Sequence, residues 1–221
     1  MNKDSIFDIV YNCETEKLNE YLKENSDIKN IKNIKNQTLL MLATSPSILY
    51  KRNRMLTGNE IKKMVDSLIS NDCDINAQDD KGNTALLNSI ESHNFTATLI
   101  LLGTKSIDVK IRNNFGDNAL MLLMQTYWEI NKELLEEIFS ILIKMKIDIN
   151  EQTYIGNNAL KYAIQSGNLI GVKLLYTLNT LDIKFLGKNK DEVKQYVKDH
   201  TQNIQIVNYF YNMLDNIEYE I

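Results

Sequence analysis

The sequence is short of the residues that mark β-rich and disulfide-stabilised folds. Its 221 residues include 1 proline and 8 glycines, too few for the many tight turns of a β-sandwich or barrel. The only cysteines, Cys13 and Cys73, cannot form a disulfide framework and lack the spacing of metal ligands. These scarcities favour a helical protein in a reducing compartment.

A long apolar run and an excess of positive charge are also missing. The sequence has no stretch of about 18 consecutive apolar residues that could cross a membrane. Asp4 and Asp8 interrupt the opening segment, where a signal peptide needs an apolar core. The net charge of -4 argues against a whole-molecule binder of nucleic acid or anionic lipid. We therefore expect a cytoplasmic protein without a membrane segment.

Two short sequence motifs, which we call the first word and the second word, recur along the chain with a period of about 34 residues. Two of the periods are longer than this. The first word is Asp, an aliphatic residue and Asn or Lys; it occurs at Asp27-Ile28-Lys29, Asp74-Ile75-Asn76, Asp108-Val109-Lys110, Asp148-Ile149-Asn150 and Asp182-Ile183-Lys184. The second word begins at Asn36-Gln37-Thr38, Gly82-Asn83-Thr84, Gly116-Asp117-Asn118 and Gly156-Asn157-Asn158. This periodicity predicts internal repeats.

The second word contains the signals of a tight turn followed by a helix. Its first residue is Gly or Asn, the residues that adopt positive φ at least cost, and its third is a good N-cap. Apolar periodicity predicts a second helix in each unit, over residues 64–69, 95–102, 134–145 and 169–175. The two longer periods predict insertions at about 45–60 and 126–133, between the paired helices.

The two ends of the chain predict further helix pairs. Residues 5–10 and 18–22 form the first pair, with Ser5-x-x-Asp8 as a capping signal, and residues 192–197 and 204–214 form the last. The ends of a stack of repeats must shield its core from water, so they diverge from the internal pattern.

A turn, two helices and a returning Asp-Ile-Asn hairpin at this period resemble ankyrin repeats. Residues 79–86 followed by 99–103 resemble the family best, and residues 71–79 match its inter-repeat hairpin closely. The family's Thr-Pro-Leu-His motif lacks both Pro and His in all four copies here. Losing that Pro costs about 0.4 to 1 kcal/mol per repeat, so we expect modest stability. The resemblance implies an all-α ankyrin-repeat solenoid, one domain over 1–221, with segments 1–30 (cap), 31–78, 79–112, 113–152, 153–186 and 187–221 (closing helices).

The inventory of reactive side chains gives no support to catalysis. His93 and His200 fall in or beside turns, and Cys73 takes a position that suits a small packed residue. Glu133, Glu136 and Glu137 lie on the polar side of an amphipathic helix. No phosphate-binding loop or metalloprotease motif is present. We therefore predict a protein that is not an enzyme and needs no metal or cofactor.

The resemblance instead implies protein binding through the concave face and the hairpin tips. Carried over residue by residue, the binding positions are Ile34, Lys35, Gln37, Asp80, Lys81, Asn83, Glu91, Asn114, Phe115, Asp117, Gln125, Tyr154, Ile155, Asn157 and Gln165. The second insertion adds Tyr127 and Trp128, because aromatic residues are enriched at binding hot spots.

The expected activity is to inhibit or sequester an unidentified protein partner, by analogy with immunity proteins or host-directed effectors acting in a host cytosol. We expect a monomer. The alternative is a binder of nucleic acid or anionic lipid through residues 51–63, where Lys51, Arg52, Arg54, Lys62 and Lys63 outnumber the single acidic Glu60.

Overall fold

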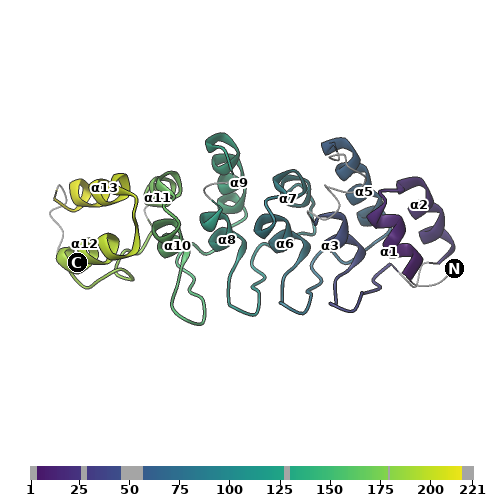
Figure 1. Cartoon of the computed structure of the whole chain (residues 1–221), viewed down its shortest axis with the longest axis horizontal. Coiled ribbons are helices and arrows are strands. Elements are labelled where there is room, and N and C mark those ends of the chain that lie inside the picture. Colours follow the sequence, from purple (N-terminus) through teal and green to yellow (C-terminus); the bar gives the residue numbers. More distant parts are fainter. Residues whose placement is uncertain (1–3, 26–28, 46–56, 127–129, 179, 216–221) are drawn as a thin grey trace. The chain divides into compact units, whose positions relative to one another are not determined.

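The computed structural model describes residues 4–25, 29–45, 57–126, 130–178 and 180–215. The regular elements in these ranges are all helices, and no strand occurs among them (Figure 1). The protein is therefore all-α, as predicted. The chain divides into two compact units, Met1–Asn114 and Phe115–Ile221.

The first unit is a stack of three helix pairs. They are α1 (Asp4–Tyr11) with α2 (Thr15–Glu24), α3 (Leu39–Ala43) with α5 (Gly58–Ser70), and α6 (Ala85–Glu91) with α7 (Phe95–Leu102). The first helices of successive pairs contact each other, and so do the second helices, which gives two layers. Buried aliphatic side chains such as Leu40, Leu68 and Leu101 fill the space between the layers.

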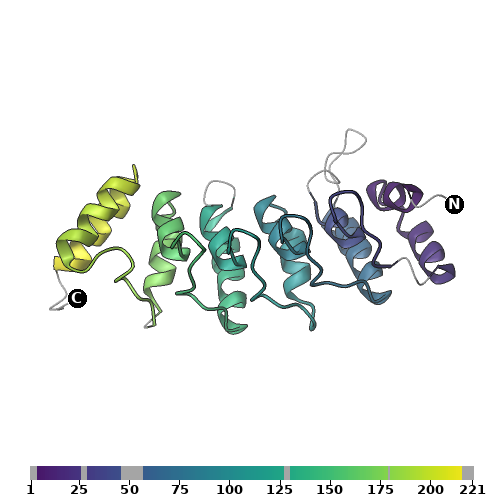
Figure 2. The same ribbon diagram turned by 90° about the horizontal axis from the view of Figure 1, so that it is seen from below.

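The second unit is built in the same way from α8 (Ala119–Gln125) with α9 (Lys132–Lys144), α10 (Ala159–Gln165) with α11 (Leu169–Tyr176), and α12 (Lys190–His200) with α13 (Ile204–Asp215). Here α10 lies between α8 and α12, while α11 lies between α9 and α13. Figure 2 views the helices of each unit from the side on which the connecting loops project. Leu120, Leu160 and Val193 are buried in this unit's core.

The predicted turns and caps are confirmed at all four second words. Asn36, Gly82, Gly116 and Gly156 have φ between 55° and 84°. The side chains of Thr38, Thr84, Asn118 and Asn158 each accept a hydrogen bond from the backbone N–H three residues later. Each cap satisfies one of the N–H groups that the first turn of a helix leaves without a partner.

Three helix starts differ from the prediction. Helix α5 begins at Gly58, because Thr57 and Glu60 form a capping box, so residues 58–60 belong to the helix and not to an insertion. Helix α9 begins at Lys132 after the N-cap Asn131, which shortens the second predicted insertion in the same way. Helix α1 begins at Asp4, so the backbone of Ser5 lies inside the helix and not at the predicted N-cap position.

The first word is also one residue out of register at its first copy. The side chain of Asn30, not Lys29, accepts from Asp74 N–H, as Asn76 does from Asp108 and Asn150 from Asp182. Asn30 is therefore the equivalent of Asn76 and Asn150. Asp27 and Ile28 themselves lie outside the described residues.

Candidate binding surface

In each unit, the loop before each first helix that carries the second word projects beyond that helix (Figure 2). We call these loops the tip loops: residues 33–37, 79–83, 113–117 and 153–157. Their first side chain folds the loop. Asp79 Oδ1 accepts from the backbone N–H groups of Lys81 and Asn83 at 2.9 Å, and Asn33 Oδ1 accepts from Lys35 and Gln37 at 2.9 and 3.0 Å. These side-chain-to-backbone bonds hold each tip in one shape without using the residues at its end.

Successive tip loops are joined by one recurring backbone hydrogen bond, the tip ladder. In the first unit Asp80 N–H donates to Lys35 O at 3.3 Å and Asn114 N–H donates to Lys81 O at 2.9 Å. In the second unit Tyr154 N–H donates to Phe115 O at 3.4 Å. The second residue of one loop always donates to the third residue of the loop before it, so the peptide groups align the tips.

Most of the predicted binding positions are exposed to solvent. They are Ile34, Lys35, Asp80, Lys81, Glu91, Asn114, Phe115, Gln125, Tyr154, Ile155 and Gln165, while Gln37 and Asn157 are half-buried. Tyr127 and Trp128 lie outside the described residues, as do Lys51, Arg52 and Arg54 of the basic segment.

Two predicted positions do not point outward, and for them the prediction is wrong. Asn83 is only 1% exposed and Asp117 only 6%. Asn83 donates to Asn88 Oδ1 at 3.1 Å and to Glu91 Oε2 at 2.8 Å, while its own Oδ1 has no partner among the described residues. Both side chains follow the turn glycine directly and fold back against a first helix, where they support the tip instead of presenting a surface.

Asp117 is held by a tyrosine that the sequence did not single out. Tyr162 on α10 donates its hydroxyl to Asp117 Oδ1 at 2.9 Å. Burial, followed by the hydrogen bond to Asp117, raises the pKa of Tyr162 to about 12. No local pattern could have revealed this contact, because its two residues lie 45 positions apart.

The second unit gathers large apolar side chains on its tips. Phe115, Tyr154 and Ile155 are 66%, 74% and 82% exposed, and we call them the apolar tip cluster. The ladder bond from Tyr154 to Phe115 holds the two loops that carry them side by side. In the first unit Ile34, 98% exposed, has the charged Lys35, Asp80 and Lys81 as its tip neighbours. The two units therefore offer tips of different character.

Polar side chains are exposed at the C-terminal ends of α8 and α10, the two helices that follow the loops of the apolar tip cluster. Gln125 on α8 and Gln165 on α10 are exposed, and Gln165 Nε2 donates to Tyr196 OH on α12 at 3.4 Å. An apolar centre with hydrogen-bonding side chains beside it is the usual anatomy of a protein–protein interface.

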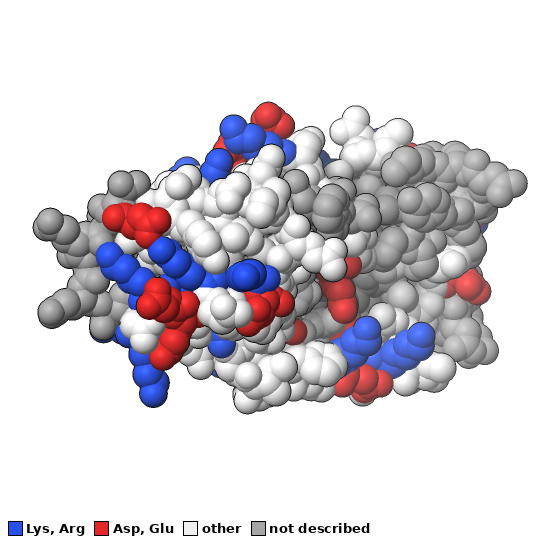
Figure 3. Space-filling model, turned by 60° about the vertical axis from the view of Figure 1, so that its left-hand side comes forward, with Lys and Arg blue, Asp and Glu red and all other residues white. Residues whose placement is uncertain are grey.

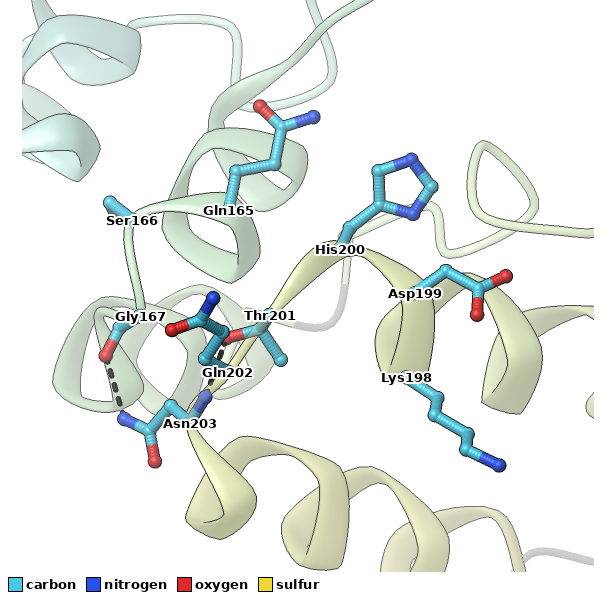
Figure 4. A pocket seen from close by; sticks show the side chains of 9 residues that line it. All are labelled: Gln165, Ser166, Gly167, Lys198, Asp199, His200, Thr201, Gln202 and Asn203. Atoms are coloured by element: carbon cyan, nitrogen blue, oxygen red, sulfur yellow. Dashed lines mark hydrogen bonds between the residues drawn. The ribbon is translucent and has the colours of Figure 1, made fainter.

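A hollow of about 670 Å³ lies between the C-terminal ends of α10 and α12 (Figure 4). Its lining includes His200, whose Nδ1 lies 2.8 Å from Tyr196 O and whose ring stacks on that of Tyr196 at 4.0 Å between centroids. Asn203 crosses the hollow to donate to Gly167 O at 2.8 Å. These contacts hold the closing helices in place and bring His200 to no nucleophile in the described lining.

Cysteine chemistry and charge offer no stronger site. Burial raises the pKa of Cys73 to about 11, and its thiol lies 3.1 Å from Lys29 O, so the reactive thiolate is suppressed. Within the predicted basic segment, Lys62 pairs with Asp66 at 2.8 Å. Figure 3 shows basic and acidic side chains side by side on the visible face, without a large area of one sign.

In the described ranges, no group of three or more His, Cys, Asp or Glu side chains is placed to hold a metal ion. None of the described helices has the length and apolar character needed to cross a membrane.

The fold thus places this chain in the all-α class, and its most distinctive surface is a set of projecting loops. A scan of the sequence against models of protein families finds no match, and a search of curated proteins finds no similar sequence.

Proposed function

We propose that the protein is a non-enzymatic binding module of the ankyrin-repeat type, and that it captures a protein partner through its tip loops. Support for the architecture comes from the recurring turn, N-cap and helix pair within each unit, together with the tip ladder. A tip loop that is folded by its own first side chain does not need particular side chains at its end, so these side chains can serve recognition.

The apolar tip cluster is the observation that carries this function. Phe115, Tyr154 and Ile155 are all more than 60% exposed, although nothing in the loop geometry demands large apolar side chains there. Contiguous exposed apolar side chains mark interaction surfaces, because burying them in a complex removes apolar area from water. Aromatic residues in such clusters often dominate the binding energy.

The test is a double substitution, Phe115→Asp with Tyr154→Asp. The protein is immobilised, partners are captured from the native lysate and identified by mass spectrometry, and the amount captured is compared with wild type. We expect at least about a tenfold loss, since each buried aromatic contributes on the order of 1 to 2 kcal/mol. The helical circular dichroism signal and melting temperature should not change.

A matched control is Ile204→Asp. Ile204 is 65% exposed in the same unit but lies at the start of α13, away from the tips. The control also replaces an exposed apolar side chain by Asp. Capture should persist, because the new charge lies away from the tips. Capture that survives in a folded double variant, or that is lost equally in the control, would refute the tip cluster as the binding surface.

A further inference from the structure

The tip ladder ends at the loop 153–157 with an unused acceptor. By the rule of the ladder, Ile155 O should receive an N–H from the second residue of a following tip loop. Among the described residues no hydrogen bond to Ile155 O is present, and Ile155 is 82% exposed.

The following tip loop is missing because the chain is shorter there. In the preceding copy, the N-cap Asn158 lies ten positions after Asp148, but the next N-cap, Asn189, lies only seven positions after Asp182. Lys188 stands where Tyr154 stood, and its N–H donates to Glu192 Oε2 at 2.7 Å instead. The helix layer continues into α12 and α13, whereas the tip layer stops one loop earlier.

A second sign of the missing loop lies at the base of the same tip. Asn118 donates its Nδ2 to Glu151 Oε2 at 2.9 Å, whereas the equivalent Nδ2 of the fully buried Asn158 has no partner among the described residues. Phe185 stands at the position equivalent to Glu151, and its side chain has no acceptor atom. The tip loop 153–157 is therefore an open edge of the ladder. It lacks a backbone N–H donor for Ile155 O and a carboxylate acceptor for Asn158 Nδ2.

The charge and size of this edge define its occupant. Lys161 Nζ donates to Gly156 O at 3.0 Å and lies 5.7 Å from the centre of the Tyr196 ring, with no carboxylate within 4.0 Å in the described residues. Helices α12 and α13 already fill the neighbouring helix positions, so another helix pair cannot stack there. An occupant that pairs with Ile155 O in the tip layer is therefore expected to be a single extended segment.

We propose that an acidic, extended peptide segment of the partner docks on this edge as a substitute for the missing tip loop. It donates a backbone N–H to Ile155 O, rests an apolar side chain on Tyr154 and Ile155, and brings a carboxylate towards Lys161. This inference rests on the proposed function, since it names the partner chemistry for one end of the tip surface. Binding by strand-like backbone pairing is a general mode of peptide recognition.

The chain supplies its own probe. A fluorescein-labelled peptide with the sequence of residues 148–157 carries the Glu151 carboxylate and the Tyr154 N–H that fill the equivalent edge one loop earlier. Its binding to the full chain is followed by fluorescence anisotropy. A peptide N-methylated at the tyrosine amide, which cannot donate, should bind about tenfold more weakly. A peptide with Gln in place of Glu151 should also lose affinity.

Protein variants locate the site. Lys161→Met should weaken the acidic peptide but not the Gln peptide, whereas Lys173→Met should weaken neither. Lys173 is a suitable control because it also lies 5.7 Å from a tyrosine ring, that of Tyr209, but projects from α11. The inference is overturned if the unmodified peptide does not bind, or if N-methylation or Lys161→Met has no effect.

Two further measurements distinguish an acidic segment from a second copy of this chain, and peptide docking from partner capture. If sedimentation shows self-association that Ile155→Asp abolishes, the edge receives a second copy of this chain and not an acidic segment. If the peptide fails to bind while Phe115→Asp with Tyr154→Asp still abolishes partner capture, this inference fails and the proposed function stands. If the peptide binds but that double substitution leaves capture unchanged, the open edge stands and the apolar tip cluster is overturned as the capture surface.

Discussion

At the scale of single residues, asparagine supplies much of the internal hydrogen bonding. Six described asparagines cap helices: Asn94, Asn118, Asn131, Asn158, Asn168 and Asn189. Asn76 and Asn150 join successive turns by accepting from one backbone N–H and donating to one carbonyl. The amide suits this role because it carries a donor and an acceptor at its end. Among the buried caps, Asn158 is the one whose donor has no partner in the described residues.

The unused donor of Asn158 predicts a stabilising substitution. Asn158→Thr keeps an N-cap oxygen, as Thr38 and Thr84 do, and removes the buried N–H₂ group. We expect the free energy of unfolding to rise by about 1 kcal/mol, because a buried unsatisfied donor costs about 1 to 3 kcal/mol. Urea denaturation measures the change. Asn118→Thr is the matched control: it removes the bond to Glu151 and should give no gain.

Two turn glycines should differ in their tolerance of alanine. Gly82 and Gly156 have φ of 74° and 80°, which costs an alanine about 1 to 2 kcal/mol. A Cβ at Gly82 would also lie 2.5 Å from Asn114 Oδ1 and 2.7 Å from Asn114 N, whereas a Cβ at Gly156 meets nothing within 4 Å. Gly82→Ala should therefore destabilise by roughly 1 kcal/mol more than Gly156→Ala. Equal melting temperatures would contradict the close approach of Asn114.

The turns and caps could be predicted from sequence because their signals lie within a few residues of each other. Gly82 and Thr84 are an example: positive φ and the N-cap depend on residue type and local spacing alone. The burial of Asp117 could not be predicted in this way, since it depends on Tyr162 arriving from another helix. The missing tip loop could not be predicted from local sequence either. It is recognised from the ladder pattern, in which Ile155 O should accept from an N–H of a following loop.

At the scale of the helix, short length is the governing fact. Helices α3, α6, α8 and α10 have only five or seven residues, too few to persist alone in water. Their stability comes from packing and from ties to the neighbouring pair. Asn94 shows such a tie: its Oδ1 caps α7 by accepting from Ala97 N–H, and its Nδ2 donates to Thr44 O at the end of α3 at 3.0 Å.

Asn94→Asp tests this tie between helix pairs. The carboxylate can still cap α7, but it cannot donate to Thr44 O and instead places a buried charge against that carbonyl. We expect a loss of about 2 to 3 kcal/mol in the free energy of unfolding. Asn131→Asp is the control, because Asn131 also caps a helix but is exposed and should change stability by less than about 0.5 kcal/mol. Equal losses would show that capping alone matters.

At the scale of the whole molecule, folding shifts the pKa of five side chains in the described part of the chain in the same direction. The pKa values of Cys73, Tyr162, Lys194, Tyr196 and Tyr209 are all raised. Burial is the main cause for the cysteine and the tyrosines, and a hydrogen bond to Asp215 is the main cause for Lys194. Folding therefore favours the protonated form of each of these groups.

This common sign predicts alkaline destabilisation. A group with a raised folded pKa contributes stability in full below its unfolded pKa, and that stability is lost as the pH rises through the folded pKa. For Cys73 the change runs from 9.0 to about 11, and for Tyr162 from 10.0 to about 12. The free energy of unfolding, measured in urea, should therefore decrease as the pH rises from 9 to 12, the range that these pKa values span.

Tyr162→Phe provides the check on this alkaline loss. The variant is less stable at pH 8, because Asp117 loses a hydrogen-bond donor, but its further loss towards pH 12 should be smaller than that of wild type. Parallel curves for the two proteins would contradict the assignment to Tyr162.

The tip ladder is made of peptide groups alone, and this separates the scaffold from the surface it presents. Asp80 and Tyr154 donate through their N–H, while Lys35, Lys81 and Phe115 accept through their carbonyls. Side chains at Lys35, Lys81, Phe115 and Tyr154 can therefore diverge among descendants of the gene without removing a ladder bond. Asp80 and Asn114 are less free to change, because Asn36 Nδ2 donates to Asp80 Oδ1 and Asn114 Nδ2 donates to Asp80 O. Mutational drift, or a laboratory library randomised at the codons of the former four residues, can change which partner is recognised while the framework folds as before.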